Sequence, residues 1–506
     1  MGLLVNIALA FLVCSVTVSE VNSLNILGLF PYQGKSHFFL FQPFLRELAK
    51  RGHSITVVSH FPQKEPLKNY TDISLAGSVK ILEDVFPIEK SYATVINIGI
   101  FLVSSGTENC KVLLQNKEVQ NLWKTQTKFD VILVEQFNSD CSLGLAHRFG
   151  VPVVGLTSHS PMPWHFDRLG IPSNPSYVPF MFFGGGTKPT LYQRMEVFIF
   201  KGYFSFIYKW FSQRVDQNTL AVYFDDVPPL EDLGRELKFL LTYNNPVLFG
   251  PSLLPANVKE VGGYHVAAPK PLSGDLKKFI DEAEHGVIYI SFGSMLKASS
   301  TPRDKVEAII AAVSELPQRV VWKWEEPNLP GKPDNIFISD WLPQNDILAH
   351  PNVLAFYSHC GMLGTTEAIH HGVPMLGMPI FGDQPSNAAG IEESGLGILI
   401  DVVTLTKEEL LKQIVPNKVK LISKAWHDRP MSAMDSAVFW TEYVAKHKDF
   451  NFRTPAADVP LYKYFNLDIL AIFTSIFYAL FYVVKSLFCS SKTQSNTQSK
   501  KKSKKS

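Results

Sequence analysis

Short apolar runs alternate with segments of helical periodicity in the first third of the chain. The run LNILGLF precedes a turn and a segment, 38–51, whose apolar residues recur on one helical face, and the run SITVVS follows. The order strand, helix, strand predicts parallel pairing with a right-handed crossover. FDVILV and VPVVGLT repeat the pattern around a helix predicted over 139–149. The first part of the chain therefore predicts a doubly wound parallel sheet.

A second alternating series begins near Val287. The run VIYISF is followed by a turn at Gly293 and Ser294 and by a helix predicted over 302–316. The runs RVVWKW, NIFIS, NVLAFYS and VPMLGM come next, each with a turn or a helix behind it. Runs of this length, bounded by turn residues and separated by helical segments, are typical of buried parallel strands. A second doubly wound sheet is expected here.

The two series predict an α/β protein with two facing Rossmann-like domains. The Pro- and Gly-rich segment 262–275 is the expected linker between them, and ligands are expected in the cleft at the carboxyl ends of the strands. The aromatic stretch from Trp164 to about Asn245 is interpreted as an irregular loop that connects the domains or lies on the acceptor side. The expected divisions are a leader (1–23), a first domain (24–245), a second domain (246–455), a juxtamembrane segment (456–468), a membrane helix (469–488) and a basic tail (489–506).

Both ends of the chain carry targeting features. The first 23 residues hold a short apolar core followed by small residues, which is typical of a secretory signal peptide, although no Lys or Arg precedes the core and an uncleaved anchor is the alternative. Segment 469–488 is long enough to span a bilayer, and the lysines behind it predict a cytosolic tail and a lumenal body. The final KSKKS resembles dilysine retrieval signals of the endoplasmic reticulum, and Asn69 begins a glycosylation sequon.

Charge and cysteine content narrow the class of protein further. The formal net charge of the 506-residue chain is +2, which gives no electrostatic case for binding nucleic acid. Five cysteines in a chain of this length do not make a disulfide framework. Cys14 lies in the leader and Cys489 at the membrane edge, so at least one of Cys110, Cys141 and Cys360 is expected to keep a free thiol.

Most of the candidate ligand-binding residues lie in one segment, SHCGMLGTTEAIHHGVPMLGMPIFGDQP, which begins at Ser358. It follows an apolar run and enters a helix, so its backbone N–H groups and glycines form a ready anion site. Glu367 falls one helical turn later, where a carboxylate can accept the hydroxyls of a ribose, and an ordinary capped glycine turn is the alternative. Trp341 and Gln344, one strand earlier, suit stacking on a base and bonding to its edge. The residues expected to wrap a diphosphate are His359, Gly361, Leu363 and Gly364.

These motifs resemble the family of membrane-bound UDP-glycosyltransferases, and most closely its insect members. RGHSITVVSH, SFGSM, WLPQNDILAHPNV, the segment from Ser358 and RPMSAMDSAVFWTEYVAKHK all fit, and the resemblance covers nearly the whole chain. It implies a GT-B fold and a UDP-sugar as co-substrate, with no cofactor. It also implies that Trp341 stacks on uracil, Gln344 contacts base or ribose and Glu367 holds the ribose. Ser294, His359, Gly361 and Gly364 would bind the diphosphate, and Asp383 and Gln384 the sugar.

The resemblance also implies a general base. His37 follows the first strand at the cleft end, where the family keeps its catalytic histidine, and imidazole titrates near neutral pH. Many relatives have an aspartate directly after the strand FDVILV, whereas this chain has Glu135 there and Asp140 five residues on. Either acid is a candidate partner for His37, with Asp140 preferred. No Asp-x-Asp pair occurs in the sequence, so no metal is expected on the diphosphate.

The acceptor is the least defined part of the prediction. The segment SHSPMPWHFDRLG, 158–170, with Trp164, His165 and Phe166, is expected to line a pocket for a flat lipophilic molecule, and simple core packing is the alternative. Glucose is the expected sugar, and UDP-glucuronic acid is the alternative donor. An epimerase or phosphorylase of the same architecture, and a membrane-tethered binding protein without catalysis, are the other function classes. A homo-oligomer is left open.

Overall fold

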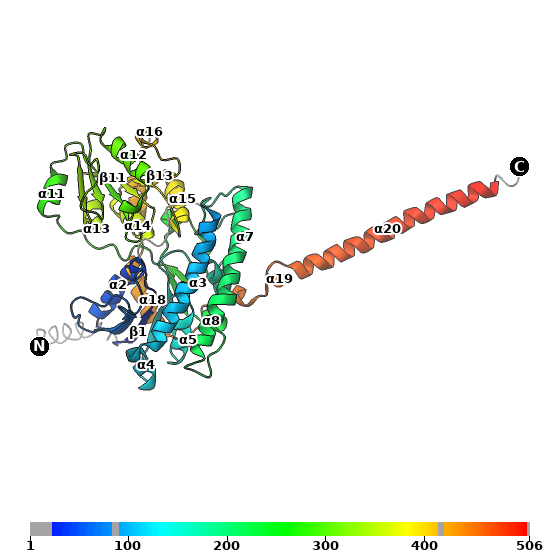
Figure 1. The fold of residues 1–506 in the computed structure, drawn as a ribbon. Helices are drawn as coiled ribbons and strands as arrows, with labels where there is room; N and C mark the ends of the chain where they lie inside the picture. Colours follow the sequence, from blue (N-terminus) through cyan, green and yellow to red (C-terminus); the bar gives the residue numbers. More distant parts are fainter. Residues whose placement is uncertain (1–22, 83–90, 413–418, 503–506) are drawn as a thin grey trace, which may run out of the picture. The chain divides into compact units, whose positions relative to one another are not determined.

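The computed structural model describes residues 23–82, 91–412 and 419–502, with side chains up to residue 486. These residues form one compact unit that ends at Arg453 and a second unit that begins at Thr454 (Figure 1). The predicted signal peptide lies outside the described residues except for Ser23.

The first sheet of the larger unit has seven parallel strands in the order β3-β2-β1-β4-β5-β6-β7. The strand order reverses between β1 and β4, because β1 pairs with β2 on one side and with β4 on the other. This reversal is the switch point at which a doubly wound sheet opens a crevice. The strands are β1 (Asn25–Phe30), β2 (Ser54–Ser59), β3 (Tyr70–Ser74), β4 (Val131–Glu135), β5 (Val153–Leu156), β6 (Phe239–Thr242) and β7 (Val258–Glu260).

The second sheet repeats this design with six parallel strands in the order β10-β9-β8-β11-β12-β13. Its switch point lies between β8 and β11, so the residues that follow these two strands share one crevice. The strands are β8 (Val287–Ser291), β9 (Arg319–Lys323), β10 (Ile336–Ser339), β11 (Val353–Ser358), β12 (Met375–Gly377) and β13 (Gly397–Leu399). The two predicted doubly wound sheets are confirmed.

Helices connect the strands of both sheets. Around the first sheet they are α2 (Lys35–Lys50), α3 (Tyr92–Gln115), α4 (Lys117–Lys124), α5 (Cys141–His147), α6 (Pro163–Leu169), α7 (Leu191–Ile207), η1 (Tyr208–Gln213), α8 (Arg214–Leu220), α9 (Leu230–Arg235) and α10 (Pro246–Phe249). Around the second sheet they are α11 (Gly274–Asp281), η2 (Ala298–Ser300), α12 (Arg303–Val313), α13 (Gln344–Leu348), α14 (Met362–His371), α15 (Gln384–Ser394), α16 (Lys407–Lys412), α17 (Val419–His427) and α18 (Ala433–Lys446).

Helices α6, α7, η1, α8 and α9 lie in the stretch from Trp164 to Asn245, so its interpretation as irregular was wrong there, whereas residues 171–190 contain no helix or strand. Helix α7 begins with a capping box in which the Thr190 side chain accepts the Gln193 backbone N–H and the Gln193 side chain accepts the Thr190 N–H. This Thr-x-x-Gln signal is visible in the sequence. The hydrophobic periodicity did not indicate this helix, because α7 carries apolar residues on both its buried side and its exposed side.

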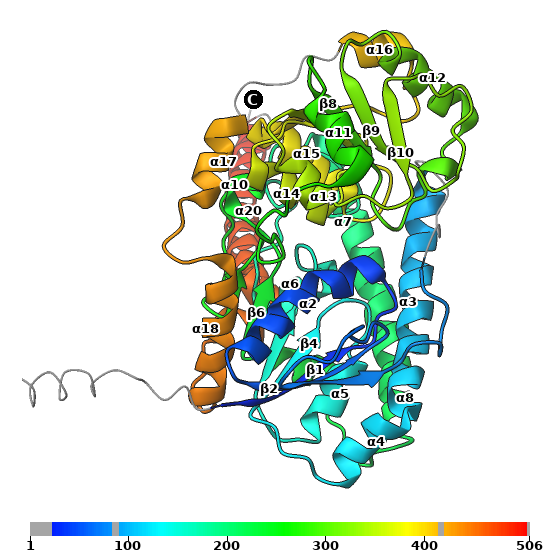
Figure 2. The same cartoon turned by 90° about the vertical axis from the view of Figure 1, so that its left-hand side faces the viewer.

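The boundary between the two domains lies further along the chain than the predicted position after residue 245. Strand β7 belongs to the first sheet, so that sheet continues beyond residue 245 to Glu260, and α11 of the second sheet starts at Gly274. Helix α18 then returns to the first sheet and lies beside α2 and β6 (Figure 2). Its position there is supported by an ion pair from Arg51 Nη2 to Asp435 Oδ1 (2.5 Å).

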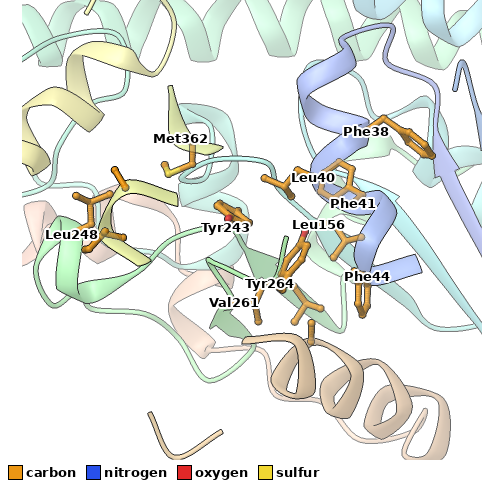
Figure 3. Packing of buried hydrophobic residues seen from close by; sticks show 14 of the residues in the cluster. Phe38, Leu40, Phe41, Phe44, Leu156, Tyr243, Leu248, Val261, Tyr264 and Met362 are labelled. Carbon is orange, nitrogen blue, oxygen red and sulfur yellow. The ribbon is translucent and has the colours of Figure 1, made fainter. Parts of the chain in front are cut away.

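One apolar core joins the two sheets. Phe41 and Phe44 of α2 share a buried cluster with Met362 of α14, and Tyr243 and Tyr264 lie between them (Figure 3). The rings of Phe44 and Tyr264 are 5.8 Å apart, and those of Tyr243 and Tyr264 are 5.3 Å apart. The cleft between the sheets therefore has a packed floor.

The cysteines divide as the odd count suggested. Cys110 of α3 and Cys141 of α5 form a disulfide, and the thiol of Cys360 is buried. Asn69 of the sequon is exposed in a left-handed turn (φ 63°), and its Nδ2 donates to Ala49 O (3.3 Å). Glycosylation at this residue stays a prediction.

The smaller unit contains η3 (Pro455–Asp458), α19 (Leu461–Tyr464) and α20 (Leu467–Lys502). The first part of α20, Leu467–Ser486, has a mean hydropathy of 2.1 and is, among the described residues, the single stretch long and apolar enough to cross a membrane. It overlaps the predicted membrane helix over 469–488.

Candidate active site

A cavity of about 450 Å³ opens where the carboxyl ends of the two sheets face each other. Its wall on the side of the second sheet includes each of the ten residues that the sequence predicted for the donor. They are Ser294, Trp341, Gln344, His359, Gly361, Leu363, Gly364, Glu367, Asp383 and Gln384.

Trp341, Gln344 and Glu367 form one end of this wall. Trp341 follows β10 and is 62% exposed, and the ammonium of Lys35 lies over its ring, 5.5 Å from the centroid. Gln344 begins α13, and its Nε2 donates to Glu367 Oε2 (2.5 Å). Burial raises the pKa of Glu367 to about 7, and the bond from Gln344 opposes this shift. The acid and the amide therefore form a preorganised polar pair beside an aromatic platform.

The turn between β11 and α14 holds His359 between two glycines. A Cβ at Gly293 would lie 2.7 Å from the imidazole Nε2, and a Cβ at Gly361 would lie 2.5 Å from the same atom. Burial, and then the charge of Lys323, lower the pKa of His359 to about 4, so the ring is neutral at physiological pH. A neutral imidazole N–H and the amino end of α14 present hydrogen-bond donors, as a diphosphate requires.

Asp383 and Gln384 lie at the start of α15. Gln384 Oε1 accepts the backbone N–H groups of Ile380 (2.8 Å) and Phe381 (3.1 Å), which holds the preceding turn in shape. Asp383 Oδ2 accepts Asn387 Nδ2 (2.8 Å). Burial raises the pKa of Asp383, while the bond from Asn387 and the charge of His37 across the cavity act in the opposite direction.

His37 stands on the other side, in the first turn of α2. Its Nδ1 lies 2.6 Å from Glu135 Oε1 and 3.0 Å from Ser158 Oγ. The ring packs against Tyr32 and Phe137, whose centroids each lie 4.6 Å away. Because Nδ1 is committed to the carboxylate and the hydroxyl, Nε2 is the nitrogen left for a substrate.

Asp140 does not contact His37, so the preference for Asp140 as its partner was wrong. Its carboxylate receives Arg168 Nη1 (3.0 Å) and Nη2 (2.8 Å), and also Gln213 Nε2 (2.8 Å). Asp140 and Arg168 are fully buried. Asp140 occupies the N-cap position of α5 without a side-chain cap bond. The end of β4 directs Glu135 to His37, and the loop that follows places Asp140 in a buried ion pair.

The prediction that Trp164, His165 and Phe166 line the acceptor pocket was also wrong. Trp164, His165 and Phe166 of α6 are not among the described residues that line the cavity. The Trp164 ring stacks on Tyr208 at 4.3 Å, and its Nε1 donates to Phe137 O (3.0 Å). The core-packing alternative is thus the observed one.

A different apolar wall faces the donor residues. Its side chains come from the loop after β1, from α3, from the loops after β4 and β5, and from the segment before α7. Because these residues are scattered along the chain, no short sequence motif identifies them. They are Tyr32, Ile98, Phe101, Leu102, Phe137, Met162, Met181 and Phe182. From the predicted acceptor segment 158–170, Ser158, His159 and Met162 do line the cavity, whereas the sequence analysis missed the lining residues Lys35 and Lys323. Burial lowers the pKa of His159 to about 3, which keeps this ring neutral beside His37.

Comparisons with known proteins agree with this geometry. The family model described as UDP-glucoronosyl and UDP-glucosyl transferase matches residues 28–503. The chain is 36% identical to UDP-glycosyltransferase UGT5 of Dactylopius coccus over 92% of each chain. It is 31% identical to UDP-glucuronosyltransferase 2B17 of Mus musculus, over 87% of this chain and 88% of that relative.

Solved structures share the fold. The crystal structure of UDP-glucose: anthocyanidin 3-O-glucosyltransferase in complex with UDP superposes with a TM-score of 0.54 at 17% identity, over 83% of this chain and 98% of that chain. This likeness confirms the expected GT-B arrangement. The chain therefore belongs to the family of UDP-glucoronosyl and UDP-glucosyl transferases and is a glycosyltransferase.

Proposed function

We propose that this glycosyltransferase moves glucose from UDP-glucose to a hydroxyl group of a small lipophilic molecule, with inversion at the anomeric carbon. The observation that carries the proposal is the contact of 2.6 Å between His37 Nδ1 and Glu135 Oε1. His37 lines the cavity together with the donor residues and the apolar side chains, and Glu135 contacts it through Nδ1. A histidine in this position can serve a hydroxyl that enters from the apolar side.

His37 acts as the general base in this mechanism. Nε2 takes the proton of the acceptor hydroxyl while the acceptor oxygen bonds to the anomeric carbon of glucose and the bond from that carbon to the β-phosphate oxygen breaks. Glu135 stabilises the imidazolium that forms and keeps the ring oriented, as in the acid–histidine pairs of hydrolases. Attack from the face opposite the departing UDP inverts the anomeric centre.

The wall on the second sheet holds the leaving group. Uracil stacks on Trp341, Gln344 bonds to base or ribose, and Glu367 accepts the ribose hydroxyls. The developing charge on UDP is met by the amino end of α14, by the neutral His359 and by the backbone at Ser294. Asp383 and Gln384 hold the sugar hydroxyls.

Glucose suits this site better than glucuronic acid. Among the described residues that line the cavity, the Lys and Arg side chains are Lys35 and Lys323. The ammonium of Lys323 is 2.7 Å from Glu325 Oε1, and that of Lys35 lies over the rings of Phe39 (5.6 Å) and Trp341 (5.5 Å). The sugar end carries a carboxyl group, Asp383, which favours hydroxyl donors over a second carboxylate.

The membrane arrangement follows from α20 and the lysines behind it. The apolar part of α20 spans the bilayer, the lysine tail lies in the cytosol, and the body lies in the lumen of the endoplasmic reticulum. The alternative of a catalytically inactive binding protein is disfavoured by the intact His37–Glu135 pair.

A transfer assay tests the proposal. The full chain in microsomes is incubated with radiolabelled UDP-glucose or UDP-glucuronic acid and with simple phenols and alcohols, and the anomeric configuration of the product is determined by NMR. We expect β-glucosides from the α-linked donor. The variant His37→Ala, assayed under the same conditions, is the control for transfer that does not depend on the general base. Preferred use of UDP-glucuronic acid would contradict the donor assignment, and an α-product would contradict inversion.

A further inference from the structure

A buried histidine outside the cavity faces the carboxylate of Glu367. The side chain of His265, in the linker between β7 and α11, is 6% exposed, and His265 is not among the described residues that line the cavity. Its Nε2 lies 3.8 Å from Glu367 Oε1 and has no hydrogen-bond partner among the residues that the structure describes. A buried polar atom without a partner is costly, so its presence calls for a reason. The geometry makes Glu367 the partner to consider.

The sequence GGYH holds His265 in this position. Gly263 has a φ of 106°, which side chains rarely adopt, and a Cβ there would lie 2.6 Å from the indole of Trp426. The guanidinium of Arg429 donates from Nη1 to Gly262 O (2.9 Å). Because the turn is packed against one side chain and hydrogen-bonded to another, it presents the imidazole of His265 in a defined orientation.

Tyr243 selects the tautomer of this imidazole. The Tyr243 hydroxyl is hydrogen-bonded to His265 Nδ1. Burial raises the pKa of Tyr243 and lowers the pKa of His265 to about 3, so the phenol keeps its proton and the imidazole is neutral. When the phenol donates to Nδ1, the single ring proton is on Nε2 and faces Glu367. The other tautomer would place the Nε2 lone pair against an ionised carboxylate, which is repulsive.

The Glu367 carboxylate has acceptor sites for His265 and for a ribose at the same time. An ionised carboxylate offers two oxygens with about four acceptor sites. Gln344 Nε2 donates to Oε2 (2.5 Å), and His265 faces Oε1. One site is then left on each oxygen, which matches the two hydroxyls of a ribose. A movement of roughly 1 Å would shorten the contact from 3.8 Å to an ordinary hydrogen-bond distance of about 2.9 Å.

We propose that His265 is a positioning residue for donor binding: its Nε2–H donates to Glu367 Oε1 when the donor binds and orients the carboxylate so that each oxygen accepts one ribose hydroxyl. The inference rests on the proposed function, since it supposes that Glu367 holds the ribose. Tyr243 lies in the apolar floor that joins the two sheets (Figure 3), so the relay connects this floor to the donor wall. A histidine with a purely structural role would stabilise the fold and would not affect the recognition of the ribose.

Deoxyribose ligands test the proposal. The Kd values of UDP, 2′-deoxy-UDP and 3′-deoxy-UDP are measured by calorimetry on the full chain in detergent micelles. The parent is expected to prefer UDP to each analogue by about tenfold or more, because a missing hydroxyl leaves a buried acceptor unpaired. His265→Phe keeps a ring and removes the N–H, so it should reduce this preference several-fold for at least one analogue.

Two further variants separate positioning from packing. His265→Gln carries an amide N–H that can replace Nε2–H, so it should restore most of the preference for UDP. Tyr264→Phe is the matched control, because it removes a buried hydroxyl from the neighbouring linker residue, whose ring packs on Tyr243 at 5.3 Å. It should leave both preferences as they are in the parent. If His265→Phe weakens the three ligands equally, or keeps the preferences of the parent, the proposal is overturned.

A double variant shows whether His265 acts through Glu367. In a Glu367→Gln background, His265→Phe should cause no further loss of preference, and a further loss would overturn the proposal. If His265→Phe does not fold, Tyr243→Phe decides, since it releases the tautomer and should lower the preference in the same direction; an unchanged preference overturns the proposal. A parent chain that binds the three ligands equally would instead contradict the ribose role of Glu367 in the proposed function, and the inference would fall with it.

Discussion

The two walls of the cavity are built in different ways. The donor wall draws nine of its ten predicted residues from one continuous segment, 341–384. The apolar wall collects single side chains from α3 and several separate loops of the first domain. A nucleotide is recognised by backbone donors and a few polar groups in fixed local geometry, which a short segment can supply. A lipophilic acceptor needs mainly shape and apolar surface, which many scattered side chains can provide.

The walls also differ in their electrostatics. The donor wall holds buried titratable groups, with the pKa of Glu367 raised to about 7 and that of His359 lowered to about 4, both chiefly by burial. The apolar wall is mostly hydrocarbon and aromatic, with His37 at its edge. Perturbed groups of this kind cluster at functional sites. The comparison implies that substitutions on one wall should leave the function of the other intact.

The largest effect should come from His37, at the junction of the walls. His37→Ala is expected to lower kcat towards a simple alcohol by about 100- to 10,000-fold, because general-base catalysis is lost. The Kd for UDP-glucose, measured by calorimetry, should not change. An acidic phenol such as 4-nitrophenol should lose less activity than the alcohol, since it ionises without help. Retained activity towards the alcohol would remove His37 from the mechanism.

The next test separates the two acids near β4. Glu135→Gln is expected to lower kcat roughly 100-fold, because the imidazolium of His37 loses its stabilising charge. The thermal unfolding midpoint should stay nearly constant. Asp140→Asn should behave in the opposite way and lower the free energy of unfolding by about 3 kcal/mol, because it leaves the buried Arg168 without its closest carboxylate.

To compare Glu135→Gln with Asp140→Asn, kcat is calculated per folded molecule of each variant. If Asp140→Asn reduced kcat as much as Glu135→Gln does, the separation between a catalytic acid and a structural acid would fail.

A pH series on Glu367 probes the donor wall alone. The Glu367 carboxylate accepts both ribose hydroxyls only when it is ionised, so the affinity for UDP-glucose should rise about tenfold from pH 6 to pH 8, through the pKa of about 7. Glu367→Gln should bind more weakly at pH 8 and show a flatter profile. Each phosphate of UDP-glucose keeps a single, strongly acidic hydroxyl that is already ionised at pH 6, so the ligand does not titrate in this range. Equal slopes in the two proteins would contradict the role of Glu367.

The same residue has a predictable effect on stability. The folded-state pKa of Glu367, about 7, lies above the ordinary value of 4.5, so its ionisation in the folded protein is unfavourable. This cost is absent below pH 4.5 and complete above pH 7. Glu367→Gln should therefore gain stability relative to the parent as the pH rises from 5 to 8 in the absence of ligand, as measured by denaturant unfolding.

The smallest effect is expected on the apolar wall. Phe182→Ala enlarges the acceptor end of the cavity, so it should shift the ratio of kcat/KM values several-fold towards bulkier acceptors, with the KM for UDP-glucose unchanged. Trp164→Ala is the matched control, since its ring packs on Tyr208 outside the cavity. That variant should lose about 3 kcal/mol of stability and keep the acceptor preference of the parent. A change of acceptor preference in Trp164→Ala would instead support the original prediction that Trp164 belongs to the acceptor site.

The sequence by itself was sufficient for the two parallel sheets and for the donor wall. Strands buried on both faces are continuous apolar runs, so β1, β2, β8 and β11 stand out in the sequence close to their observed bounds. The donor residues lie in the turns and helix starts that follow such strands, and the carboxyl ends of parallel strands meet at one edge. All ten predicted donor residues line the cavity, including Ser294, Asp383 and Gln384, which only the resemblance to the family had suggested.

Tertiary structure alone decided the partner of His37, the apolar wall and the nature of the stretch before β6. His37 and Glu135 are 98 residues apart, and their contact depends on the pairing of β1 with β4 and on the direction in which the loop after β4 leaves the sheet. Trp164 and Phe182 are both aromatic, and only packing places one against Tyr208 and the other in the cavity. Local patterns specify which residues form an element and which side of it is apolar. When both sides are apolar, as in α7, or when two acids follow one strand, the choice is made by long-range contacts that the sequence pattern does not contain.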